Sequence, residues 1–189
     1  MKNIRTRDQY DAVAQKLVGL EIQRVTYFEI EYGTDEPCYL HQPEIGHFLD
    51  YGLEFKTRDD GFRTFFWDGT FYQYGIGIFP HEAKCEVTTS RQWDVSATSD
   101  WRPFIGSMIT SVDVFWSWAS ESVTDDEAFR TYYPQDLRLS FSCHRHIYLS
   151  ASQYMDLSDR LWAMSDDILV VFDETVAQKY AIGPYALGT

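Results

Sequence analysis

A repeated pattern constrains the fold of this chain more than any other feature of its sequence. Residues 18–25 and 105–112 both read apolar-Gly-x-x-Ile-x-x-Val, and their glycines lie 87 positions apart in a chain of 189 residues. Because this distance is close to half the chain, the pattern predicts an internal duplication into two similar halves, 1–95 and 96–189. A glycine before an alternating strand is common, so chance similarity between two strand-rich halves is the alternative.

A predicted β-hairpin follows each copy of the pattern. In the first half, segments 53–58 and 62–67 flank an Asp-Asp-Gly turn. In the second half, segments 137–141 and 147–149 flank a polar turn at 143–145. Apolar and polar residues alternate along these segments, which is typical of antiparallel strands that bury one face.

One further strand and several helices are predicted from local patterns. The run at 168–172 is apolar on both faces and indicates an interior strand. Segment 7–18 has apolar residues at helical spacing after a Thr-x-x-Gln capping box, which predicts a helix. Shorter helices are expected at 125–130, 152–163 and 174–180.

These elements predict an α+β fold, made mainly of antiparallel β-sheet from two similar β-rich halves with a few short flanking helices. No change of composition separates domains, so we expect residues 1–189 to form a single compact unit. The polar stretch 88–100 is the expected joint between the halves. A chain of this length buries about 70% of its unfolded surface, so its core needs no disulfide or metal.

The charge of the chain excludes several classes of function. Sixteen basic residues against 29 acidic ones give a formal net charge of −13. Such a charge argues against binding to nucleic acid or to anionic lipid, since both depend on Lys and Arg. The longest apolar run is too short to span a membrane, and no apolar stretch follows the N-terminus. With three cysteines, an odd number, reduced thiols in a cytoplasm are expected.

Each cysteine has a histidine close by in the sequence, which raises the possibility of a metal site. If residues 143–146 formed a strand, His144 and His146 would share one face and could chelate an ion. Cys38 and His41 form a second candidate pair. None of these clusters has the paired spacing of structural zinc sites, and buried cysteines with surface histidines are the alternative.

A cysteine nucleophile is the other chemical possibility. Cys143 lies beside His144, Arg145 and His146, and positive charge would favour its thiolate. No family signature surrounds any of the cysteines, and the phosphate-binding glycine motifs are also missing. We therefore assign no catalytic residue and expect no cofactor, and a metal- or Cys/His-dependent hydrolase is the competing hypothesis.

Adjacent carboxylates recur along the chain and are interpreted as structural. They fall at predicted turns or helix starts, where Asp and Glu satisfy free backbone N–H groups. The pairs and triplets are Asp59-Asp60, Asp125-Asp126-Glu127, Asp166-Asp167 and Asp173-Glu174.

Aromatic residues make up 17% of the chain and suggest a binding surface. Where rings are consecutive on a strand they point to opposite faces, so one face of the sheet packs the core and the other also carries rings. Rings that only fill the core are the alternative. The residues assigned to a candidate partner surface are Trp67, Asp68, Tyr72, Trp116 and Trp118.

Together these features favour a non-enzymatic cytoplasmic binding protein whose acidic, aromatic surface engages a basic protein partner. An immunity-type inhibitor of a toxin is one concrete form of this hypothesis. Besides the hydrolase, a small-molecule or carbohydrate-binding module with its ligand at the junction of the halves is an alternative. The sequence leaves the oligomeric state open.

Overall fold

The structure is a computed structural model that describes residues 6–30, 33, 36–69, 71, 75–83, 90–120, 130–155 and 160–186. Its elements in chain order are α1 (Arg7–Gln15), β1 (Ile22–Ile30), the 3-10 helix η1 (Cys38–Leu40), β2 (His47–Leu49), β3 (Gly52–Thr57), β4 (Phe62–Asp68), β5 (Gly75–Phe79), β6 (Ser90–Asp94), β7 (Ile109–Ser120), β8 (Arg130–Phe141), β9 (His146–Met155), β10 (Arg160–Val171), α2 (Glu174–Lys179) and the 3-10 helix η3 (Gly183–Tyr185).

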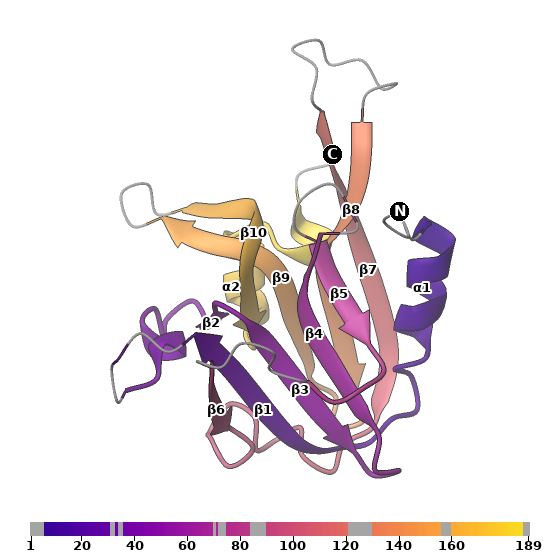
Figure 1. Ribbon diagram of the computed structural model, residues 1–189, viewed down its shortest axis with the longest axis vertical. Helices are drawn as coiled ribbons and strands as arrows, with labels where there is room; N and C mark the ends of the chain where they lie inside the picture. The colour runs from indigo at the N-terminus through magenta and orange to yellow at the C-terminus, as the bar shows by residue number, and fades with distance from the viewer. Residues whose placement is uncertain are drawn as a thin grey trace.

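Two five-stranded antiparallel sheets form the body of the protein (Figure 1). The first has the order β5-β4-β3-β1-β6, and the second has the order β2-β10-β9-β8-β7. In each sheet, four neighbouring strands follow one another along the chain: β1, β3, β4 and β5 in the first sheet, and β7, β8, β9 and β10 in the second. The short strand β2 comes between β1 and β3 in the sequence but pairs with β10 of the second sheet. The β-rich α+β fold predicted from the sequence is confirmed, and β2 ties the two sheets together.

The main hydrophobic core lies between the sheets, and a second cluster lies outside the second sheet. Ile168 and Val170 of β10 belong to the main core, whereas Leu169 and Val171 pack in the outer cluster with Ala177 of α2. All four β10 side chains are fully buried. The interior strand predicted at 168–172 is therefore confirmed, and its two apolar faces serve two different clusters.

Two of the predicted helices are present. The capping box of α1 forms as expected, because Thr6 Oγ1 accepts from the Gln9 N–H and the Thr6 N–H donates to Gln9 Oε1. The helix ends at Gln15, before the predicted end at residue 18. Helix α2 begins after Asp173, whose carboxylate accepts the Thr175 N–H at 2.6 Å.

The helix predicted at 152–163 is wrong. Its first residues belong to β9 and its last to β10, with Trp162 opposite Gln153 and Ala163 opposite Ser152. The apolar spacing looked helical, but pairing between the two strands overrides that local preference. The helix predicted at 125–130 falls almost entirely outside the described residues; Arg130 is the first residue of β8.

Both predicted hairpins form. The Asp-Gly turn joins β3 to β4, with Asp60 in the left-handed region at φ 57°. A turn at 142–145 joins β8 to β9, where the Phe141 N–H donates to the Arg145 carbonyl at 2.8 Å.

The two copies of the repeated pattern pair with each other. The Gly19 N–H donates to the Ile109 carbonyl at 2.8 Å. In return, the Gly106 N–H donates to the Ile22 carbonyl at 2.7 Å. Around this pair of bonds, the equivalent positions Glu21 and Met108 form an isolated antiparallel bridge. The two motifs thus meet around a local two-fold relationship, while duplication of the whole halves stays a prediction.

Candidate functional site

A groove of about 810 Å³ is lined by the segment around η1 and by residues in or next to β2, β10 and β9, which are neighbouring strands of the second sheet. Carboxyl groups reach it from three separate segments: Glu36 before η1, Asp50 after β2 and Asp167 in β10. No Lys or Arg occurs among the described residues that line it, which are Glu36, Pro37, Cys38, Leu40, His41, Phe48, Asp50, Gln153 and Asp167.

A wide bulge in β10 brings Asp167 to the groove. Ala163 pairs with Ser152 and Ile168 pairs with Ala151, so residues 164–167 have no partners on β9. Side chains hold the bulge, because the Asp167 N–H donates to Ser165 Oγ at 3.1 Å and the Met164 N–H donates to Gln135 Oε1 at 3.2 Å. Bulges of this kind redirect side chains and are frequent beside functional sites.

The bulge corrects the interpretation of the Asp166-Asp167 pair. The sequence predicts a turn or a helix start at this pair, but both residues lie within β10. Asp166 is exposed and Asp167 is half-buried. In the sequence, the only visible sign was two adjacent acids directly before the apolar run at 168–172. The register of β10 on β9 shows that these acids leave the β9–β10 pairing.

The electrostatic environment of the groove disfavours additional negative charge. Burial, together with the nearby carboxylates of Asp166 and Asp50, raises the pKa of the Asp167 carboxyl to about 6. Asp50 is held in place because its Oδ1 accepts the Ile30 N–H at 3.0 Å. A cation bound between these acids would offset their mutual repulsion.

Large apolar side chains stand at the edge of the groove. Leu40 lines it and is 44% exposed, and Phe48 contributes an aromatic ring. Trp162 lies directly opposite Gln153, a lining residue, so both side chains project from the same face of the hairpin. Trp162 is 60% exposed, the largest exposed fraction among the large hydrophobic residues described. Charge and exposed apolar surface therefore lie side by side.

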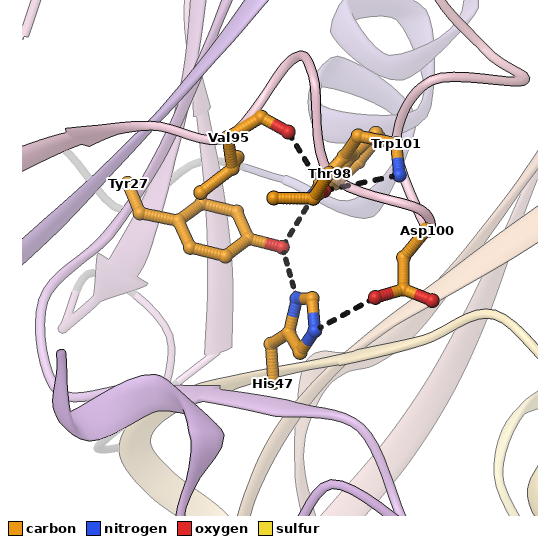
Figure 2. A network of polar contacts seen from close by, with 6 residues as sticks. All are labelled: Tyr27, His47, Val95, Thr98, Asp100 and Trp101. Carbon is orange, nitrogen blue, oxygen red and sulfur yellow. Dashed lines mark hydrogen bonds and ion pairs between the residues drawn. The ribbon is translucent and has the colours of Figure 1, made fainter.

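A separate polar network lies inside the protein (Figure 2). The Tyr27 hydroxyl is 2.8 Å from His47 Nδ1 and accepts the Trp101 indole N–H at 2.5 Å. On the other side of the imidazole, His47 Nε2 is 3.4 Å from Asp100 Oδ2. The backbone N–H of Trp101 donates to Thr98 Oγ1 at 3.4 Å, and this bond holds the loop that carries Asp100.

This network connects the sheets and is closed to substrates. Tyr27 belongs to β1 of the first sheet and His47 to β2 of the second. Tyr27 and Trp101 are fully buried and His47 is 4% exposed, so no reacting molecule reaches their polar atoms. Burial lowers the pKa of His47, and the nearby Asp100 carboxylate partly counters this effect. We interpret the network as a structural link.

The aromatic residues assigned to a partner surface lie on both sheets. Trp67 of β4 is 41% exposed, whereas the neighbouring Asp68 is 6% exposed. Trp116 of β7 packs edge-on against Tyr10, and its indole N–H donates to Asp11 Oδ1 at 3.1 Å. Trp116 therefore has a role in packing.

Two further members of that set have different outcomes. The guanidinium of Arg130 lies 4.1 Å from the centre of the Trp118 ring, a cation–π contact within the β7–β8 hairpin. Tyr72 lies outside the described residues.

The Cys/His clusters do not form one site in the described part of the chain. His144 lies in the turn with φ 59°, so it does not share a strand face with His146. His146 Nε2 instead lies 3.4 Å from Glu174 Oε2. Cys143 packs against the main core, and Cys38 and His41 line the groove. Within the described ranges, no three His, Cys, Asp or Glu side chains are arranged to hold a metal ion.

Comparison of the chain with known protein families, with curated proteins and with solved structures gives no match. Within the part of the chain that the structure describes, no helix has the length and hydropathy needed to cross a membrane.

Proposed function

We propose that this protein is a non-enzymatic cytoplasmic binding protein that engages a basic protein partner at the groove. One observation carries this proposal: Glu36, Asp50 and Asp167 converge from three segments on one hollow whose described lining has no Lys or Arg. An arginine or lysine side chain inserted there would form charge-assisted hydrogen bonds with these carboxylates.

The charge of the whole chain favours the same class of partner. A net charge of −13 attracts cationic proteins over a distance of about one Debye length, ~8 Å at physiological salt. Such steering raises association rates and makes them sensitive to ionic strength. An immunity-type protein that covers a cationic toxin surface would use both the field and the groove.

The edge of the groove favours a protein over a small cation. Protein interfaces combine buried aromatic anchors with a polar rim, and Trp is enriched among the residues that dominate their energy. Leu40 lines the groove and Trp162 lies opposite the lining residue Gln153, and both offer exposed apolar surface. A small cation would leave this surface in water, whereas a partner protein would cover it.

A labelled arginine-rich peptide provides a direct test, with a glutamate-rich peptide of equal length as the negative probe. Fluorescence anisotropy is measured at low and at physiological salt. We expect binding of the arginine-rich peptide alone, with an affinity that falls as salt rises. In the double variant Glu36→Gln with Asp167→Asn, the affinity is expected to fall at least about tenfold.

A matched control separates the groove from the overall charge. Asp8→Asn combined with Asp60→Asn removes the same two charges at exposed positions that do not line the groove. This control is expected to lose much less affinity than the groove variant. Equal losses in both double variants, or binding that does not depend on salt, would show that the groove is not the binding site.

A further inference from the structure

A second cavity, of about 250 Å³, lies on the outer side of the second sheet beneath the segment that follows α2. Strands β7, β8, β9 and β10 all contribute to it. The residues that line it are Phe115, Trp116, Ser117, Gln135, Asp136, Ser150, Ser152, Leu161, Ala163, Tyr180, Ala181, Ile182 and Ala186.

A buried carboxylate with one free oxygen lines this cavity. Asp136 is 3% exposed, and its Oδ2 accepts the Gly183 N–H at 2.8 Å. Its Oδ1 has no hydrogen-bond partner among the described residues, while the side chains of Ser150 and Gln135 lie near enough to the carboxylate to lower its pKa. The basic residue two positions further along β8, Arg138, pairs with Asp113 at 2.9 Å. The buried charge of Asp136 therefore has no cation beside it within the described structure.

Two hydroxyl groups and an amide stand next to this carboxylate. Ser150 Oγ and Ser152 Oγ lie 2.7 Å apart. The Gln135 side-chain nitrogen lies 2.9 Å from the Ala151 carbonyl, 3.2 Å from Ser150 Oγ and 3.1 Å from Ser152 Oγ, and its two hydrogens serve two of these three acceptors. Each hydroxyl oxygen carries two lone pairs; the bond between the serines takes one of these four and the amide at most two, so at least one can accept a further hydrogen bond. This polar cluster lies on a sheet face that is otherwise covered by apolar residues such as Ile182.

We propose that this cavity binds an alkylammonium group, carried by a small amine or by a lysine side chain. Asp136 Oδ1 accepts one N–H of the ammonium, and the Ser150–Ser152 pair accepts another. The alkyl part lies against the apolar walls formed by Phe115, Leu161 and Ile182.

The chemistry of the cavity selects this class of ligand. An ammonium has three donors and no acceptor, which matches a cluster rich in acceptors. An anion would be repelled by Asp136, and a neutral alcohol would leave the buried charge unpaired. Burial raises the pKa of Asp136 to about 6, so the carboxyl is ionised at neutral pH. The volume equals that of about eight water molecules, which suits an amine of a few carbons.

Titration calorimetry with n-butylammonium chloride tests the proposal, with n-butanol and sodium butyrate as neutral and anionic probes of the same length. We expect butylammonium to bind at least about tenfold more tightly than butanol, and butyrate not to bind. A tripeptide with blocked ends and a central lysine then distinguishes the two sources, since only a cavity open to side chains binds it. Equal binding of butylammonium and butanol would overturn the proposal.

Variants locate the binding. Asp136→Asn keeps an oxygen for the Gly183 N–H but removes the charge, and it is expected to abolish butylammonium binding. Asp8→Asn, which removes one charge from an exposed position in α1, is expected to bind as the wild type does. If Asp136→Asn does not fold, Ser152→Ala serves instead, with an expected loss of several-fold. Unchanged affinity in these variants, or a crystal structure with only ordered water at Asp136, would refute the site.

The result is independent of the proposed function, because Asp136 and its neighbours do not line the groove. Loss of butylammonium binding in Asp136→Asn with unchanged peptide binding would separate the two sites.

Discussion

The Tyr27 hydroxyl donates its hydrogen bond to His47 Nδ1, and this bond joins the first sheet to the second. The direction follows from burial, because the Trp101 indole N–H occupies one lone pair of the hydroxyl and His47 Nδ1 lies where the buried hydroxyl hydrogen needs an acceptor. His47 then accepts at Nδ1 and carries its proton on Nε2, toward Asp100. The contacts of Trp101 with Tyr27, and of Tyr27 with His47, thus determine the tautomer of this buried histidine.

Removing the Tyr27 hydroxyl is expected to destabilise the protein. In Tyr27→Phe, the indole N–H of Trp101 loses its acceptor and His47 Nδ1 loses its donor, and both groups are buried. A buried polar group without a partner costs about 1–3 kcal/mol. Urea unfolding should show a loss in this range. Tyr132→Phe, at a position that is 41% exposed, is the control and should change the free energy of unfolding by less than about 0.5 kcal/mol.

The buried charge of Asp136 predicts a specific dependence of stability on pH. Its pKa is raised to about 6 by burial, whereas an unfolded Asp titrates near 4 (about 3.9). Between these values the folded protein binds a proton that the unfolded chain does not. This group therefore makes the protein more stable as the pH falls from above 6 toward 4, by about 3 kcal/mol.

The variant Asp136→Asn lacks this titration. Urea unfolding of both proteins is measured at several pH values. The free energy of unfolding of the wild type, relative to that of the variant, should rise by up to about 3 kcal/mol between neutral pH and about pH 4. Asp167 and His47 also titrate abnormally, but they are present in both proteins and cancel in the difference. Parallel curves would contradict the burial of an ionised Asp136.

The groove should bind a cationic partner less well in acid. A cation close to Asp167 favours the ionised carboxyl, whose pKa in the free protein is about 6. Binding to the arginine-rich peptide is therefore expected to weaken as the pH falls below about 6, by at most about tenfold per pH unit. In Asp167→Asn this decline should be reduced, whereas Asp8→Asn should keep it. A pH profile that is the same in all three proteins would place Asp167 outside the binding site.

Local signals in the sequence predicted several elements correctly. The Thr6 capping box, the turn before Gly61 and the apolar run at 168–172 each depend on contacts within a few residues. Their chemistry is decided by neighbours along the chain, such as a hydroxyl that reaches the third backbone N–H of a helix. These features are visible without any knowledge of the rest of the fold.

The groove could not be predicted because its parts are brought together by strand register. Asp167 is far from Glu36 and Asp50 in the sequence. It reaches the groove only because residues 164–167 leave the β9–β10 pairing. The same register turned the predicted helix at 152–163 into two strands. The burial of Asp136 could not be predicted either, because the sequence around it does not indicate that the segment after α2 covers it.

The repeated pattern yields a prediction about the two glycines at its centre. Gly19 and Gly106 have φ values of 91° and 79°, in the region that L-residues rarely adopt. Nothing lies within 4 Å of a Cβ added at either position, so the cost of a side chain comes from the backbone alone. Each alanine substitution is therefore expected to reduce the free energy of unfolding by about 1–2 kcal/mol, and by similar amounts at the two sites.

Asparagine provides the matched comparison, because its side chain is larger than that of alanine but tolerates the left-handed region better. Urea unfolding of Gly19→Ala, Gly19→Asn, Gly106→Ala and Gly106→Asn should show a smaller loss for each asparagine than for the alanine at the same site. Since both glycines donate to a carbonyl of the other copy, the two pairs should behave alike. A large loss at one glycine and none at the other would show that the two motifs are not structurally equivalent.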